Sequence, residues 1–264
     1  MSAYFRIVFC LLLSIVTVLT TPVSPTTLVT ATSQSGCVGS SYRIAIDIGH
    51  YRAAPGATSA NGVSEFDYNL ALAQRLLPAL NSAGFTAVTL IGEAGTTLRL
   101  EERTRIATRA GAALFVSLHH DSVQPRYLFT WIVGTKPHKY SDTFHGFSVF
   151  VSERNQMSSE SVIFARVLGE ALLNEGLTPT LHHAEPIFGE GRPLLDARLG
   201  LYRFDGLLVL RKATMPAVLL ESAVIVNRTE EQRVRSGEYH AKVVGALVTA
   251  ISSYCAMQFS SDSR

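Results

Sequence analysis

Three short apolar runs in this chain each end abruptly at imidazole or carboxylate side chains. The runs cover residues 43–50, 113–121 and 217–221. Short, partly β-branched runs of this kind are typical of buried parallel strands, and open α/β sheets bind ligands at the carboxyl ends of such strands. If the three runs are neighbouring parallel strands, His50, His119 and Glu221 project from one edge of one sheet. The sequence therefore predicts a site assembled from distant parts of the chain.

The rest of the chain alternates strand-like and helix-like patterns. With 264 residues, of which 47% are hydrophobic, it can bury a sizeable core. The alternation predicts an α/β fold, with a mostly parallel, twisted sheet of about six strands flanked by helices in a single domain. We expect strands at 43–50, 85–91, 113–118, 146–151, 207–210 and 217–220, and helices at 64–83, 98–110, 159–174 and 230–254.

The N-terminus has the pattern of an export signal. Arg6 precedes an apolar run at 7–19, which is shorter than the roughly 20 residues needed to cross a bilayer. We interpret 1–24 as a signal peptide, cleaved within 20–24 or after Ala31, with an uncleaved anchor as the alternative. A flexible leader at 25–41, a folded domain at 42–256 and a C-terminal tail at 257–264 follow. The mature protein is therefore expected to be exported, without stable membrane insertion.

Two cysteines remain once the signal peptide is removed. Cys37 and Cys255 flank the folded domain, and the termini of a domain often lie close together at its surface. An even number of cysteines in an oxidising compartment favours pairing. A Cys37–Cys255 disulfide is one expectation, and two free thiols are the other.

Two imidazoles and a carboxylate at a sheet edge suit Zn²⁺. Catalytic zinc sites use three protein ligands and leave one position for water. Glu65 opens the helix expected at 64–83 and so lies at the end of the loop that follows His50. Glu221 could then act as the general base for that water. Each residue by itself also has an ordinary structural explanation, such as a loop cap for His50 or a hydrogen-bonded core histidine for His119.

Other function classes find less support. The formal net charge is only +2 and Lys/Arg-rich runs are absent, so the sequence argues against a nucleic-acid partner. A serine hydrolase would need a nucleophile elbow, and Gly-x-Ser-x-Gly does not occur. The helical zinc motif His-Glu-x-x-His is also absent.

Four blocks occur in order between about residues 42 and 256. They are Asp47-Ile-Gly-His50, Glu65 ahead of Asn69-Leu-Ala-Leu72, Phe115-Val-Ser-Leu-His119-His-Asp121, and Val209-Leu-Arg211 followed by Pro216-Ala-Val-Leu-Leu-Glu221 and Asn227. Together they resemble the zinc-dependent N-acetylmuramoyl-L-alanine amidases of the cell-wall type, which cleave the bond between glycan and stem peptide in peptidoglycan.

The resemblance implies a role for each matched residue. His50, Glu65 and His119 would bind zinc, and Glu221 would be the catalytic base. Arg211 would steady the substrate or Glu221, with a surface or salt-bridged arginine as the alternative. The resemblance also implies a periplasmic or cell-wall-associated enzyme with peptidoglycan as substrate, and it leaves any activator protein unidentified.

The chain departs from the family pattern at several positions. Ile48 replaces a proline, Tyr51-Arg52 replace a glycine pair, and His120-Asp121 replace Ala-Asn. Val224 and Val226 stand where the family often has Phe and Ser. The altered turn at Ile48 and Tyr51 is the best support for an alternative function, a catalytically silent zinc-fold protein that binds wall peptides or regulates other hydrolases. The retention of all four matched site residues weighs against this alternative. The segment 152–158 is too short for the zinc-covering helix that some family members carry after the strand matching 146–151.

Two long segments, 122–145 and 178–202, are expected to be irregular and to lie near the site. Loops of this length in a compact enzyme tend to be lids or binding walls. The aromatic side chains of 122–145 suit either stacking on sugars or packing of the loop onto itself. Glu185 and Glu190 in the second segment could reach the open zinc position.

Overall fold

The computed structural model describes Cys37 and residues 41–261. The predicted signal peptide and most of the predicted leader lie outside the described residues. The elements in chain order are β1 (Ile44–Ile48), α1 (Glu65–Ser82), β2 (Val88–Ile91), α2 (Leu100–Arg109), β3 (Leu114–Asp121), η1 (Pro125–Tyr127), β4 (Phe129–Val133), β5 (Lys136–Tyr140), β6 (Ser148–Val151), α3 (Ser158–Asn174), η2 (His182–Ala184), β7 (Leu194–Asp196), β8 (Leu201–Arg203), α4 (Leu208–Lys212), β9 (Ala217–Val224), α5 (Arg228–Val234) and α6 (Gly237–Ser261).

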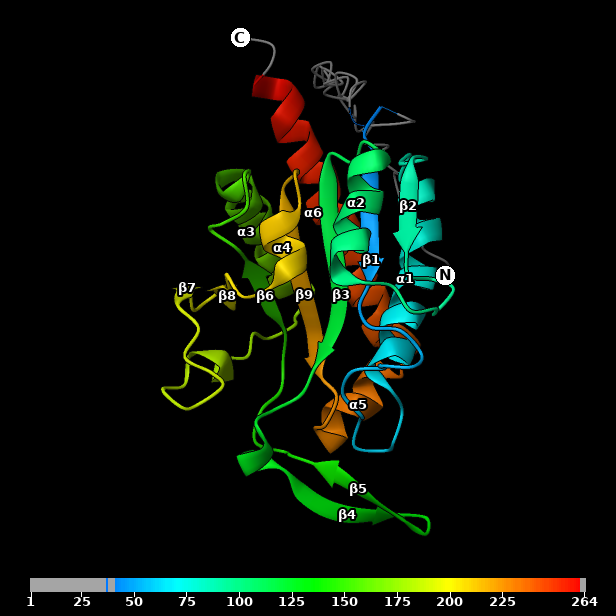
Figure 1. The fold of residues 1–264 in the computed structure, drawn as a ribbon, viewed down its shortest axis with the longest axis vertical. Coiled ribbons are helices and arrows are strands. Elements are labelled where there is room, and N and C mark those ends of the chain that lie inside the picture. The colour runs from blue at the N-terminus through cyan, green and yellow to red at the C-terminus, as the bar shows by residue number, and fades with distance from the viewer. Residues whose placement is uncertain (1–36, 38–40, 262–264) are drawn as a thin grey trace, which may run out of the picture. The chain divides into compact units, whose positions relative to one another are not determined.

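One central sheet organises these elements, and the prediction of a mostly parallel α/β sheet is confirmed. Seven strands pair in the order β2-β1-β3-β9-β6-β8-β7. The first four run parallel, whereas β6 pairs antiparallel with β9. The strands β1, β3 and β9 therefore end at the same edge, which is the lower end of the sheet in Figure 1. Their register places His119 directly beside Glu221.

Helices cover both faces of the sheet because its strands alternate apolar side chains on the two sides. Figure 1 shows α2 and α4 in front of the sheet and α6 behind it. The larger core cluster joins one face to α1, α3 and α6, and includes Ile46, Val116, Leu220, Leu76, Leu168 and Leu247. The smaller cluster joins the other face to α2 and α4, and includes Ala45, Phe115, Leu219, Ala107, Val209 and Leu210.

The strand predicted at 207–210 is wrong, because residues Leu208–Lys212 form the short helix α4. A run of four apolar residues fits a buried helix turn as well as a strand. Val209 and Leu210 pack with Ala107 of α2, so the tertiary contact selects the helix. The predicted closing helix is in fact two helices, α5 and α6, and α6 continues through Ser261.

The two segments expected to be irregular contain secondary structure of their own. Segment 122–145 forms an antiparallel hairpin of β4 and β5, which lies beyond the carboxyl edge of the main sheet in Figure 1. Segment 178–202 contains η2, β7 and the start of β8. The strands β8 and β7 extend the sheet at its far edge. Short edge strands and a hairpin with charged and exposed positions carry a weak periodic signal, which explains why sequence patterns missed them.

Among the described residues, one helix is long and apolar enough to cross a membrane by length and composition. It is the part of α6 at Gly237–Phe259, with a mean hydropathy of 1.2. Val243, Leu247, Ile251 and Tyr254 of this helix belong to the larger core cluster. We therefore interpret α6 as a core helix of the domain.

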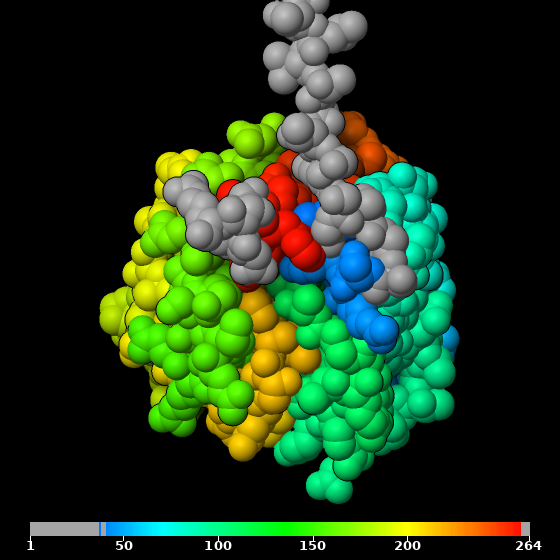
Figure 2. All heavy atoms as spheres, turned by 90° about the horizontal axis from the view of Figure 1, so that it is seen from above, coloured from blue at the N-terminus to red at the C-terminus, as the bar shows by residue number. Residues whose placement is uncertain are grey.

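The predicted disulfide between Cys37 and Cys255 is present, with 5.6 Å between the two Cα atoms. Both cysteines are buried. Figure 2 shows the C-terminal part of α6 beside the first part of the described chain, in red and blue. The bridge joins residues 218 positions apart and fastens the chain before β1 to the last helix.

Loss of this bridge is expected to destabilise the domain. A cross-link that closes a long loop typically contributes about 2–4 kcal/mol, mainly by restricting the unfolded chain. The double variant Cys37→Ser/Cys255→Ser should therefore melt about 5 to 15 °C below the oxidised protein. Adding reductant should lower the melting temperature of the parent but not of the double variant. Equal melting temperatures, or two alkylatable thiols in the unreduced parent, would contradict the bridge.

Candidate metal centre and active site

Three side chains meet at the carboxyl edge of the sheet. His50 follows β1, Glu65 is the first residue of α1, and His119 is near the end of β3. His50 Nε2 lies 3.0 Å from Glu65 Oε2, and His119 Nδ1 lies 2.8 Å from Glu65 Oε1. One possible ligand atom from each residue lies within 4.8 Å of the others. The structure thus brings together the three residues that the sequence predicted as a metal-ligand set.

The backbone at His50 adopts a left-handed conformation that non-glycine residues rarely take. Its φ is 67°, the one positive value among the described non-glycine residues. Arg103 of α2 donates to the carbonyl oxygens of Ile48 and His50, on either side of this turn. Arg103 also bonds Asp47 Oδ1 at 2.7 Å and is only 2% exposed. This buried guanidinium therefore holds the strained turn that presents His50.

Glu65 is fixed by more than the two imidazoles. Its side chain also accepts hydrogen bonds from the backbone N–H of Ala57 at 3.0 Å and from Asn69 Nδ2 at 3.3 Å. Burial raises the pKa of Glu65, but hydrogen bonds with His119 and His50 outweigh burial and hold its pKa well below the usual range. Glu65 is consequently an ionised carboxylate aimed between two imidazoles.

Strand alternation separates the roles of His119 and His120. Successive residues of a strand point to opposite faces, so His119 shares the face of Glu221 and His120 points to the other face. His120 Nδ1 lies 2.7 Å from Asn69 Oδ1, and its ring packs against Tyr68. Burial lowers the pKa of His120 to about 3. His120 is therefore a neutral core histidine that supports α1.

Glu221 lies beside His119 in the neighbouring strand. Burial raises its pKa well above the ordinary value, and the nearby carboxylates of Asp121 and Glu65 raise it further. One of its oxygens, Oε2, is buried without a hydrogen-bond partner among the described residues. A carboxyl group with a free, buried oxygen and a raised pKa is a good candidate for moving a proton.

Two cavities flank these residues. A cavity of about 280 Å³ lies between the His50 turn, His119 and apolar side chains of the 97–100 and 207–209 segments. A smaller cavity of about 110 Å³ contains Glu221, Gln124 and Glu190. Leu207 and Leu219 line both cavities, so the cavities are neighbours, and we refer to the two together as the cleft.

The loop between His50 and Glu65 is also anchored from the far side. Glu231 of α5 is fully buried and accepts hydrogen bonds from Ser59, Asn61 and Tyr68 at 2.6–2.8 Å. Because this loop connects two of the three converging residues, the buried carboxylate of Glu231 helps to fix their separation. The sequence analysis missed both Glu231 and Arg103, since charged residues inside helical patterns are usually solvated.

Other predicted residues lie around this centre. Arg211 is half-buried in the last turn of α4, and no bond joins its side chain to Glu221 among the described contacts. Glu185 accepts a hydrogen bond from Tyr127, and Glu190 contacts Gln124 and His183. The two loop glutamates thus bond to other loop residues rather than to His50 or His119.

Several aromatic residues of 122–145 pack onto the protein. Tyr127 and Phe144 contact each other with ring centroids 5.0 Å apart, beside the cluster of Val123, Val224 and Val226. Trp131 donates to the carbonyl oxygen of Ala60 at 2.7 Å. Of the two roles expected for the aromatic residues of this segment, these side chains therefore have the packing role. Phe129 is 60% exposed.

The donor set suits a zinc ion. Two imidazole nitrogens and a carboxylate oxygen, with a cleft on one side, are the ligands and the opening that a catalytic zinc requires. The hydrogen bonds that hold Glu65, together with the Arg103 contacts at the His50 turn, orient the ligands in the way outer-shell partners do in metal sites. Fold and site together define the class of the protein as a metal-dependent α/β hydrolase.

Comparison with known proteins agrees with this class. A family model described as N-acetylmuramoyl-L-alanine amidase, Amidase_3, matches residues 44–253. AmiA of Salmonella typhimurium is 25% identical over 227 residues, which cover 82% of this chain and 77% of the relative. AmiA of Escherichia coli K12 is 24% identical and covers 80% and 75%. The chain therefore belongs to the Amidase_3 family of N-acetylmuramoyl-L-alanine amidases.

Solved structures show the same fold. Ami1 from Mycobacterium smegmatis aligns with a TM-score of 0.65 and 21% identity, covering 84% of this chain and 99% of the other. AmiC2 of Nostoc punctiforme aligns with a TM-score of 0.60 and 24% identity, covering 82% and 98%.

Gly49 offers a test of how tightly the site is packed. A Cβ at this position would lie 2.3 Å from the ring of His119, so Gly49→Ala must displace that ring or the His50 turn. Because a displacement of about 1 Å can cost 100-fold in rate, we expect Gly49→Ala to lower activity about 10- to 100-fold and to weaken metal retention. Gly237→Ala, where a Cβ meets no atom within 4 Å, is the matched control. Parent-like activity and metal content in Gly49→Ala would show that the packing does not hold His119.

Proposed function

We propose that this protein is an exported zinc amidase that hydrolyses the bond between N-acetylmuramic acid and L-alanine in peptidoglycan. His50, Glu65 and His119 are the proposed zinc ligands, and Glu221 is the proposed general base and acid. The observation that carries the proposal is the register of β3 and β9, because it sets Glu221 beside His119 and next to the three-ligand cluster.

Each side chain has a defined part in the proposed reaction. When bound, zinc polarises the amide carbonyl and makes the attacking water more acidic. Glu221 takes a proton from this water as the new C–O bond forms, and it returns the proton to the amide nitrogen as the C–N bond breaks. The raised pKa of Glu221 suits both steps, since it strengthens the base and keeps the proton available for the leaving amine.

Export rests on the apolar run at 7–19 and on the buried disulfide, which is typical of oxidising compartments. A periplasmic or cell-wall location follows from the substrate. A structure of the CwlD amidase from Clostridioides difficile contains the GerS lipoprotein, and CwlD has a TM-score of 0.61 with this chain. An activator protein for the present chain stays a prediction, and its identity is unknown.

The competing function is a silent protein that binds wall peptides. Its best support is the altered turn at Ile48 and Tyr51, which departs from the family pattern. In the structure, however, Arg103 holds this turn and His50 still reaches Glu65. The altered turn is therefore compatible with an assembled metal site, which favours the enzyme.

Substitution of the ligands and of the base should have different effects. His50→Ala, Glu65→Gln and His119→Ala should each lose the zinc of this centre together with activity, since each removes one of its three ligands. Glu221→Gln should keep zinc but lower turnover by about 100- to 10,000-fold, the usual contribution of general acid–base catalysis. Zinc is measured by elemental analysis, and turnover by dye release from labelled peptidoglycan with mass spectrometry of the released peptides.

The exposed His145 supplies a control, and His145→Gln should behave as the parent. Full zinc occupancy in His119→Ala, with loss in His120→Gln instead, would overturn the choice of ligand. A parent that binds zinc and peptidoglycan without releasing any peptide would favour the silent alternative.

Arg211 has a narrower expected role. If it steadies the substrate, Arg211→Ala should raise KM several-fold while zinc content stays unchanged. The adjacent, exposed Lys212 gives a matched control of the same charge in the same helix turn. Equal kinetics for Arg211→Ala and Lys212→Ala would assign Arg211 to the surface.

A further inference from the structure

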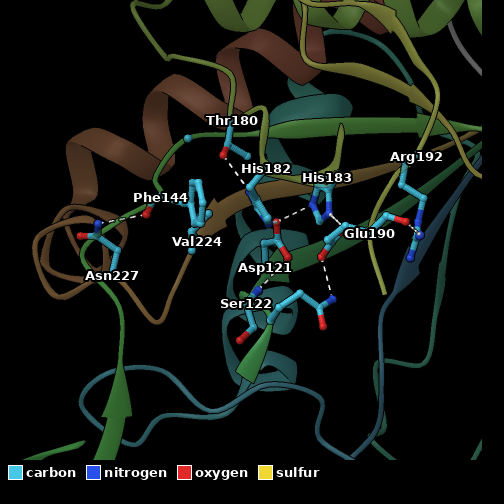
Figure 3. A network of polar contacts seen from close by, with 12 residues as sticks. Asp121, Ser122, Phe144, Thr180, His182, His183, Glu190, Arg192, Val224 and Asn227 are labelled. Atoms are coloured by element: carbon cyan, nitrogen blue, oxygen red, sulfur yellow. Dashed lines mark hydrogen bonds and ion pairs between the residues drawn. The ribbon is translucent and has the colours of Figure 1, made fainter. Parts of the chain in front are cut away.

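A second cluster of potential metal ligands lies where segment 178–202 meets the end of β3. Asp121 is the last residue of β3, and His182 and His183 are the first two residues of η2 (Figure 3). His183 Nε2 lies 2.8 Å from Asp121 Oδ2, and His182 Nε2 lies 3.3 Å from the same oxygen. All three residues are at most 9% exposed. Two imidazole nitrogens therefore point at one buried carboxylate oxygen.

The other polar atoms of these side chains already have partners. His182 Nδ1 lies 2.9 Å from Thr180 Oγ1, and His183 Nδ1 lies 3.0 Å from Glu190 Oε2. The backbone N–H of Ser122 donates to Asp121 Oδ1 at 2.7 Å. Metal-ligating histidines nearly always bond a carboxylate or another acceptor through the second ring nitrogen, which fixes the ring orientation. Both histidines show this arrangement, with Nε2 left as the ligand atom (Figure 3).

His182 provides an independent indication. It is 2% exposed, and its buried Nε2 lies 3.3 Å from Asp121 Oδ2 without forming a hydrogen bond to that oxygen. Buried polar atoms nearly always make well-formed hydrogen bonds, so a nitrogen that is aimed at a carboxylate without one points to a missing ligand. Phe144 stacks on the His182 ring at 5.0 Å, which leaves little freedom for the ring to turn elsewhere.

The residue types are the same as in the first centre. There, too, two imidazoles contact one buried carboxylate, at 2.8 and 3.0 Å, although each imidazole contacts a different oxygen. Tetrahedral zinc with bonds of about 2.0–2.1 Å keeps its ligand atoms about 3.3 Å apart. The imidazole–carboxylate distances of 2.8–3.3 Å in the two clusters lie near this value.

We propose that Asp121, His182 and His183 bind a second divalent transition-metal ion, with zinc as the best match to a set of two imidazoles and one carboxylate. The metal joins η2 to the end of β3 and thereby fixes segment 178–202 against the sheet. His183 and Glu190 line the same small cavity as Glu221. The second metal thus holds one wall of the cleft in place and lies outside the first ligand set.

A metal-free clamp is the competing arrangement. Burial lowers the pKa of His183, but the carboxylates of Asp121 and Glu190 outweigh burial and raise its pKa to about 9. A protonated His183 between two carboxylates would hold the loop by ion pairs alone. Metal stoichiometry distinguishes the two arrangements, because the clamp binds no metal.

The experiment counts zinc in the purified full chain after loading and exhaustive dialysis. The parent should contain two zinc ions per chain, and Glu65→Gln should keep the one at the second site. Asp121→Asn and His183→Gln should each keep the one at the first site. His145→Gln should contain two. A parent with one zinc that Glu65→Gln removes completely would overturn the proposal, and so would two zinc ions in both Asp121→Asn and His183→Gln.

A second measurement needs no substitution at the site. Titration of metal-free parent with zinc by calorimetry should show two equivalents bound per chain, and one equivalent would overturn the proposal. The second equivalent should also slow proteolytic cleavage within 185–192, since it fixes this loop. Loss of the first zinc in Glu65→Gln tests the proposed amidase centre separately. If one of the two sites binds no metal, the measurement at the other site still gives a clear result.

Discussion

The carboxylate of Glu65 is the interaction on which the active site depends. It joins two imidazoles that come from separate parts of the chain, and it does so from the first turn of α1. A buried carboxylate is unfavourable unless it is paired, and here the hydrogen bonds from the histidines, Asn69 and the Ala57 backbone offset its burial. The same pairing that makes the burial tolerable also sets the two imidazoles in place.

Charged groups buried behind these three side chains keep the arrangement rigid. Arg103 links the end of β1 to α2 and holds the left-handed turn at His50, while Ser117 donates to the second oxygen of Asp47. Glu231 anchors the loop that leads to Glu65. These buried polar contacts hold the side chains of the site in position, and most of the donors and acceptors in them are satisfied.

The two long loops support the cleft in different ways. The 122–145 hairpin packs through Tyr127, Phe144 and Trp131 against the sheet edge and the loop after His50. The 178–202 segment meets β3 through Asp121 and His183 and brings Glu190 to the cavity of Glu221. Each loop is fixed by a few polar or aromatic contacts made over long sequence distances, which neither periodicity nor composition reports.

The sequence by itself determined the α/β class, the three parallel strands that place His50, His119 and Glu221, the start of α1 at Glu65, and the pairing of Cys37 with Cys255 as one of two outcomes. The strand ends differ from the expected ones, because β3 continues to Asp121 and β9 to Val224. Local apolar patterns suffice for these features because each strand or helix must bury its own apolar face. Only the tertiary structure decided that 208–212 is helical, that β6 runs antiparallel to β9, and that Arg103 and Glu231 are buried. It also brought His182 and His183 to Asp121 across 61 and 62 positions, because strand order and loop docking follow from long-range packing that no local pattern encodes.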